Sequence, residues 1–147
     1  MTKVVRAASF HQAVSDELLT LISDGARKVT PVQLDRLVRR LPEIRLRVTQ
    51  VEDFPQLADQ VEFLAELVED FQSGLSRNVP FVAIAEAAFS LKYLLKGVDI
   101  IPDVIPGIGF ADDAAIIALV MERWKSAFLR EVIDRNAKDR AKPALDD

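Results

Sequence analysis

The chain has 147 residues, of which 50% are hydrophobic and 29% are charged, and its formal net charge is −4 at pH 7. This length is typical of one domain, and the apolar content excludes a disordered or low-complexity protein. The lack of cysteine excludes disulfides, thiolate metal sites and cysteine nucleophiles, and a single histidine excludes multi-histidine metal sites. The negative net charge gives no sign of a nucleic-acid-binding protein.

The sequence predicts neither a secretory signal nor a membrane-spanning helix. The first ten residues contain Lys3 and Arg6 but lack the apolar core of a signal peptide. The most apolar stretch, residues 79–95, is interrupted by Glu86 and Lys92. Each charge at the centre of a membrane helix costs roughly 2.5–3.5 kcal/mol. We therefore expect a soluble, cytoplasmic protein with buried core helices, with a membrane-associated hairpin as the alternative.

Charge is distributed in blocks along the chain. The net charge is +4 over residues 1–50, −7 over residues 51–76 and −1 over residues 77–147. The favoured interpretation is that a basic and an acidic helix lie next to each other in one bundle. We interpret three arginines as a solvated basic edge paired with the acidic helix, with phosphate or anionic lipid as the alternative partner: Arg36, Arg39 and Arg40.

The first predicted helix has apolar residues three or four positions apart, at Phe10, Val14, Leu18 and Leu21. Asp24 and Gly25 predict its end. His11 lies beside the apolar face, and we interpret it as a surface or half-buried residue because no nucleophile is identifiable as its partner.

A capping box predicts the start of the second helix, because Thr30 can cap it, Pro31 suits its first turn and Gln33 completes the box. The buried face is formed by Leu34, Leu37, Val38 and Leu41. Pro42 predicts the end of this helix. Residues 43–51 alternate as in a strand, but no second strand is available for pairing, so we assign them to a short helix.

The third helix has a heptad-like stripe, and acidic residues occupy its other faces; the stripe is Phe54, Leu57, Val61, Leu64, Val68 and Phe71. Asp53 is predicted to cap the helix, and Gly74 lies just past its end. The stripe spans three heptads at most. Packing within a bundle is therefore favoured over a coiled-coil dimer.

Two apolar helices complete the expected fold. One runs from residue 80 to residue 96 with Gly97 as its stop, and Glu86 and Lys92 on it are expected to reach separate partners in the bundle. The other begins near Asp112 and runs to about Arg140 as a single helix. Its first half is apolar on nearly all sides and must be buried, and its second half narrows to a stripe of Trp124, Phe128, Val132 and Arg135.

The segment between these helices contains a tandem repeat, Asp99-Ile100-Ile101-Pro102 and Asp103-Val104-Ile105-Pro106. Two prolines four residues apart prevent an ordinary helix. The apolar side chains of such a loop must be buried in the core, in a partner or in a lipid surface. The aspartate side chains can then accept hydrogen bonds from the N–H groups of the buried backbone. Asp112 or Asp113 is expected to cap the final helix.

The pattern D-x-I-P-D-x-I-P-x-x-G-x-x-D-D, with a tyrosine upstream, resembles the YkvA-like family of bacterial proteins, a domain of unknown function. The matching residues are Tyr93, Asp99, Ile101, Pro102, Asp103, Ile105, Pro106, Gly109, Asp112 and Asp113. The resemblance covers residues 80–121 and implies a compact helical hairpin, often regarded as membrane-associated, without an established reaction. Gly97 stands where family members often carry proline, and this difference leaves the turn more flexible.

The aspartate cluster of this motif has three possible roles. Structural capping is the favoured one, because Asp99 and Asp103 lie next to prolines. Binding of a divalent cation by Asp99, Asp103, Asp112 and Asp113 is a weaker alternative, since their spacing matches no calcium-loop template. A metal-dependent hydrolase using the same aspartates is the weakest.

The sequence therefore predicts an all-α, single-domain bundle of five or six helices with a buried apolar Asp/Pro loop between the last two long helices. Residues 1–79 are expected to form amphipathic helices around a hairpin of residues 80–141, and residues 142–147 to fray. The favoured function is a non-enzymatic interaction or structural module without a cofactor or catalytic residue. The alternative is a peripheral membrane protein. For either function, the expected partner is an unidentified protein or a membrane surface rather than nucleic acid. An oligomer is also compatible with the sequence.

Overall fold

The computed structural model describes the backbone of residues 16–50, 54–75, 78–99 and 108–141, and the side chains of residues 16–50, 54–75, 78–95 and 113–137. His11 and the loop residues from Ile101 to Pro106 lie outside these ranges. All regular secondary structure in these ranges is helical. The helices are residues 16–27, which form an N-terminal helix, α2 (Pro31–Val48), α3 (Leu57–Gln72), α4 (Phe81–Asp99), α5 (Ile108–Arg123) and α6 (Lys125–Ala141). The predicted all-α fold is confirmed.

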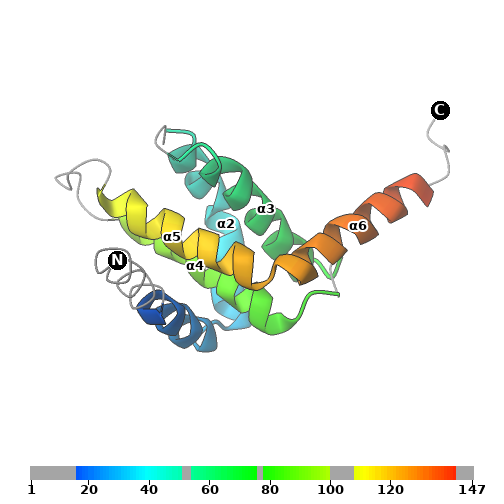
Figure 1. Cartoon of the computed structure of the whole chain (residues 1–147), viewed down its shortest axis with the longest axis horizontal. Coiled ribbons are helices and arrows are strands. Elements are labelled where there is room, and N and C mark those ends of the chain that lie inside the picture. Colours follow the sequence, from blue (N-terminus) through cyan, green and yellow to red (C-terminus); the bar gives the residue numbers. More distant parts are fainter. Residues whose placement is uncertain (1–15, 51–53, 76–77, 100–107, 142–147) are drawn as a thin grey trace, which may run out of the picture.

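Helices α2 to α5 surround one hydrophobic core, and α6 leaves the bundle and projects away from it (Figure 1). Helix α4 contacts α2, α3 and α5, and α5 also contacts α3. The core combines the apolar stripes of these helices; its largest fully buried aliphatic side chains are Ile22, Leu41, Ile44, Leu57, Leu64, Leu67, Ile84, Leu91, Leu94, Ile116 and Ile117. The apolar face of each helix therefore meets the others in the interior, as helical periodicity requires.

Helix α2 begins with the predicted capping box. The Gln33 N–H donates to Thr30 Oγ1 at 3.2 Å, and the Thr30 N–H donates to Gln33 Oε1 at 3.3 Å. The prediction that Pro42 ends the helix is wrong, because α2 continues to Val48. A proline inside a helix costs about 3 kcal/mol. The helix continues because its buried residues keep steps of three and four across Pro42, at Leu34, Leu37, Leu41, Ile44 and Val48.

The helix of residues 16–27 passes through Asp24 and Gly25, so the predicted stop at these residues is wrong. Gly25 instead allows this helix to approach α4, because a Cβ atom at this position would overlap the ring of Phe89. The absence of a side chain thus serves close packing of two helices rather than a helix terminus.

Helix α3 ends as predicted, with Gly74 just past its last residue. Gly74 has a φ of 79°, which favours glycine, and its N–H donates to the Phe71 carbonyl at 3.1 Å. The Leu75 N–H donates to the Asp70 carbonyl at 2.7 Å, and the two bonds together form a Schellman motif. At the other end, α3 begins at Leu57 with no side-chain cap at Gln56, and the predicted cap Asp53 lies outside the described residues.

The last two helices differ from the prediction at three points. Helix α4 runs through Gly97 to Asp99, so Gly97 is not a stop. Helix α5 begins at Ile108, so Asp112 and Asp113 lie inside the helix and neither one caps it. The predicted single final helix is interrupted at Trp124 and divided into α5 and α6. No proline or glycine marks this break, which explains why helical periodicity alone does not reveal it.

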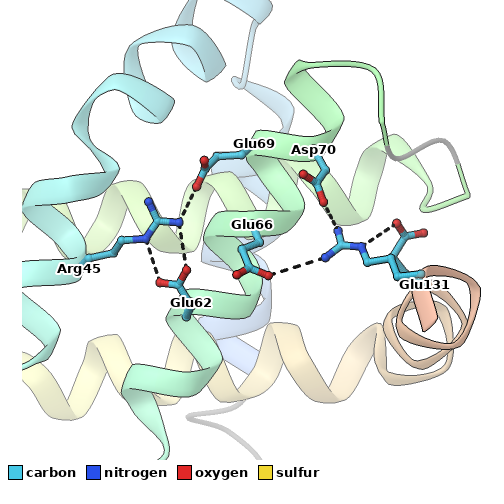
Figure 2. Close-up of polar contacts among 7 residues, drawn as sticks. Arg45, Glu62, Glu66, Glu69, Asp70 and Glu131 are labelled. Atoms are coloured by element: carbon cyan, nitrogen blue, oxygen red, sulfur yellow. Dashed lines mark hydrogen bonds and ion pairs between the residues drawn. The ribbon is translucent and has the colours of Figure 1, made fainter. Parts of the chain in front are cut away.

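The basic and acidic helices do lie side by side, and Arg45, which the sequence analysis did not select, joins them. Arg39 pairs with Asp35 and Arg40 with Glu43, both within α2. Figure 2 shows Arg45 of α2 between Glu62 and Glu69 of α3. The Arg45 Nε atom donates to Glu62 Oε2 at 2.8 Å. The bond to Glu62 holds the pKa of Arg45 above its ordinary value against the opposing effect of burial, and Glu69 adds to the rise.

Candidate functional site

Of the residues that carry the YkvA-like resemblance, those with a described backbone lie toward one end of a hairpin formed by α4 and α5. Tyr93 lies on α4 and is half-buried, with its ring 6.1 Å from that of Phe89. Asp99 is the last residue of α4, and Gly109 is the second residue of α5. The five remaining loop positions of the motif lie outside the described residues: Ile101, Pro102, Asp103, Ile105 and Pro106.

Asp112 and Asp113 follow on the second turn of α5, and the Asp113 side chain is 4% exposed. A buried carboxylate requires a hydrogen-bond or ion-pair partner to offset the loss of its hydration. Among the described side chains, no group of three or more histidine, cysteine, aspartate or glutamate residues is placed to hold a metal ion. The roles of Asp99, Asp103, Asp112 and Asp113 remain predictions.

A second buried carboxylate lies near the other end of the hairpin. Glu86 of α4 is 1% exposed, and its Oε1 atom accepts a hydrogen bond of 3.0 Å from Trp124 Nε1. Its Oε2 atom lies 3.7 Å from a guanidinium nitrogen of Arg123, so the predicted partner elsewhere in the bundle exists for Glu86. Lys92, the other charge in this apolar segment, is exposed. Glu86 thus links α4 to Trp124, the residue between α5 and α6.

Helix α6 is attached to the bundle on one side only. Phe128 is buried, and its ring meets that of Phe63 on α3 edge-on at 5.3 Å. Arg135 lies 2.6 Å from Asp70 and 3.8 Å from Glu66, both on α3, and 3.3 Å from the buried Glu131 on α6 itself. Figure 2 shows Glu66, Asp70 and Glu131 around this second ion-pair centre. These contacts hold the inner side of α6 against α3.

The outer side of α6 presents apolar side chains to solvent. Leu129 and Ile133 are each 58% exposed and lie one helical turn apart, and Val132 beside them is 37% exposed. The stripe predicted at Trp124, Phe128 and Val132 is therefore buried at Phe128 but not at Val132. We call Leu129, Val132 and Ile133, with the exposed neighbours Lys125 and Arg130, the α6 outer face.

The charges on α6 are divided between its two sides. Lys125 precedes Leu129 by one turn, and Arg130 precedes Ile133 by three residues, so both cations flank the exposed apolar residues. Of the acidic residues with described side chains, Glu131 is buried against Arg135, and Asp134 accepts a hydrogen bond of 2.9 Å from Asn78. The α6 outer face is therefore apolar and basic.

Comparison with known proteins finds a family that is similar to part of the hairpin. Residues 83–119 match the family model described as "Protein of unknown function (DUF1232)". Residues 83–119 are similar to this family, and we call them the YkvA-like segment. The predicted resemblance is thereby confirmed over most of α4 and α5, and the YkvA-like segment contains Glu86, Tyr93 and Asp113.

A curated relative supports the same assignment. The "Uncharacterized membrane protein YkvA" of Bacillus subtilis (strain 168) is 33% identical over 55 residues, which cover 37% of this chain and 52% of the relative. The chain thus spans about half the length of this YkvA-like relative. No solved structure matches the chain significantly. Within the described part of the chain, every helix is too short or too polar to cross a bilayer.

The α6 outer face lies outside the YkvA-like segment, and sequence reasoning did not select it. The sequence did contain one indication of this face. Leu129 and Ile133 lie four residues apart, as on one side of a helix, next to the predicted stripe of Phe128 and Val132. Which stripe is buried depends on the orientation of α6 on the bundle, which the Phe63 and Arg135 contacts determine. Helical periodicity predicts which residues share a face of the helix, but not which face packs against the bundle.

Proposed function

We propose that the protein is a non-enzymatic helical module that associates peripherally with an anionic membrane surface through the α6 outer face. The observation that carries the proposal is the exposure of Leu129 and Ile133, 58% each, between the cations Lys125 and Arg130. A helix that lies in the membrane interface has this composition, with apolar side chains that enter the lipid boundary and basic side chains that meet its negative charge.

The strength expected of this contact is modest. Complete burial of a leucine or isoleucine side chain is worth about 1.5–3 kcal/mol, and each cation near an anionic surface about 1 kcal/mol. A single short face of this size supports reversible association that weakens as salt screens the surface charge. The name of the B. subtilis relative, a membrane protein, is consistent with this mode of action.

Liposome flotation tests the proposal. The protein is expected to float with phosphatidylglycerol-containing vesicles at low salt, and to float less with pure phosphatidylcholine or at high salt. The double variant Leu129→Glu/Ile133→Glu is expected to remain unbound, because it places two carboxylates on the contact face. Both positions are exposed, so the fold should persist, as circular dichroism will check.

A matched control changes two exposed aliphatic residues elsewhere to glutamate. Val32 and Leu46 on α2 are 60% and 65% exposed, and the variant Val32→Glu/Leu46→Glu adds the same charge away from α6. This variant is expected to float nearly as well as the unmodified chain. Failure of the unmodified protein to bind at low salt, or equal loss of binding in both variants, would overturn the proposal.

A further inference from the structure

A pocket lies between three segments of the bundle, away from the α6 outer face. Ala26 and Arg27 of the N-terminal helix form one side, Phe81 and Val82 of the first turn of α4 form another, and Arg123 of α5 closes the third. Its volume is about 300 Å³, at the lower end of the range of small-molecule sites. The pocket therefore has room for a small ligand or for part of a larger one.

The pocket wall on α4 is apolar and open to solvent. Phe81 is 48% exposed and Val82 is 52% exposed, although both are large hydrophobic residues on a helix whose next turns are buried. The buried side chain of Ala85 extends this wall toward the interior. Covering these two side chains with an apolar group would remove their surface from water, which is favourable at about 25 cal/mol per Å².

The remaining wall carries two guanidinium groups and one carboxylate. The carboxylate belongs to Glu86, which accepts a hydrogen bond from Trp124 and lies 3.7 Å from a guanidinium nitrogen of Arg123. Arg123 is held over the Trp124 ring at 5.7 Å and donates to Ser23 Oγ at 3.5 Å, yet its side chain remains 41% exposed. The Arg27 side chain is 81% exposed, and its ion pair with Asp24 is long, at 3.9 Å.

We propose that this pocket binds an anionic amphiphile, that is, one alkyl chain that ends in a carboxylate or a phosphate. The alkyl chain would lie against Phe81 and Val82, and the anionic group would meet the guanidinium groups of Arg27 and Arg123, which suit carboxylate and phosphate oxygens. Two exposed cations next to an apolar wall match a ligand that carries one negative charge and an apolar body. The site uses residues other than those of the α6 outer face and is independent of the proposed membrane contact.

Trp124 supplies a direct readout of binding, because it is the single tryptophan of the chain and both pocket residues Glu86 and Arg123 contact it. Titration with octanoate and with octyl phosphate is expected to change its fluorescence in a saturable way, with octylammonium as the control of opposite charge. An equal response to octylammonium, or a response that never saturates, would overturn the proposal.

Two variants locate the site. Val82→Glu places a negative charge on the apolar wall, and Arg27→Glu removes a cation at a side chain that is 81% exposed, so neither should unfold the protein. Each is expected to weaken octanoate binding at least tenfold, whereas the control Leu46→Glu on α2 leaves it unchanged. Unchanged binding in both pocket variants would contradict the assignment.

The anionic group can come from a free amphiphile or from a lipid in a bilayer, and the same variants distinguish these sources. If the natural source is a free amphiphile, Val82→Glu loses octanoate binding and still floats with anionic vesicles. If the pocket receives a bilayer lipid, Val82→Glu loses octanoate binding and also floats less than the unmodified chain, although its α6 outer face is intact. The variant Leu129→Glu/Ile133→Glu is expected to retain the octanoate response in either case, which separates failure of the membrane contact from failure of the pocket.

Discussion

The indole of Trp124 donates a hydrogen bond of 3.0 Å to the Glu86 carboxylate, which is 1% exposed. This bond links the YkvA-like segment to the break between α5 and α6, because Glu86 lies on α4 and Trp124 is the residue that separates the last two helices. Burial of a carboxylate is costly unless it is hydrogen-bonded or paired; here Trp124 donates the hydrogen bond, and Arg123, 3.7 Å away, supplies the opposite charge. The orientation of α6 therefore depends in part on the Glu86 carboxylate of the apolar helix α4.

Replacing Glu86 with alanine is expected to destabilise the fold by about 2–3 kcal/mol, because the Trp124 N–H then lacks an acceptor in the interior. Glu86→Gln should cost less, since the amide oxygen can still accept the bond. Urea unfolding followed by Trp124 emission measures both variants. Glu122→Ala on exposed α5 surface is the control, expected within about 0.5 kcal/mol of the unmodified chain. Unchanged stability of Glu86→Ala would show that this bond does not support the hairpin.

Gly25→Ala is expected to lower stability by about 1–3 kcal/mol, although alanine favours helix, because the new methyl group overlaps the Phe89 ring. Thermal unfolding measures the loss. Combining Gly25→Ala with Phe89→Leu should recover part of it by giving the methyl group space. Glu17→Ala on the same helix serves as the control, because Glu17 is exposed. A stabilised Gly25→Ala chain would mean that the two helices lie further apart than described.

Arg135→Met is expected to loosen α6 while α2 to α5 stay folded. The change keeps an unbranched apolar side chain but leaves Glu131, which is 4% exposed, without its counter-charge, at a cost of about 1–2 kcal/mol. Amide hydrogen exchange should accelerate in residues 125–137 and remain nearly unchanged in α4. Arg130→Met, on the exposed side of α6, should leave exchange as it is. Uniform acceleration across the chain would indicate global destabilisation instead.

Asp103→Asn separates the two roles predicted for the motif aspartates. Capping predicts a lower melting temperature for the variant whether or not Mg²⁺, Ca²⁺ or Mn²⁺ is added, and no cation-dependent rise for the unmodified chain. A cation site predicts that the unmodified chain melts at a higher temperature with the ion and that Asp103→Asn loses this rise. We expect the first result. Asp59→Asn, at an exposed position of α3, is the matched control.

The helices themselves follow from local signals that the sequence carries. The capping box at Thr30 and Gln33 and the glycine at Gly74 mark helix ends through bonds between residues three to five apart. Such bonds do not depend on the rest of the fold, which explains why both predictions are confirmed. The signals that misled were Gly25 and Pro42, where packing against a neighbouring helix or over a continuous buried stripe outweighs local preference. Helix α4 also continues through Gly97.

The composition and the spacing of apolar residues determined that this chain forms an all-α bundle, and the Asp/Pro motif determined its resemblance to the YkvA-like family. The tertiary structure alone decided the break at Trp124, the burial of Glu86 and which face of α6 meets solvent. The reason is physical, because periodicity depends only on neighbours along one helix. Exposure of Leu129 and Ile133 depends on contacts that Phe63 and Asp70 make from a helix more than fifty residues earlier in the chain.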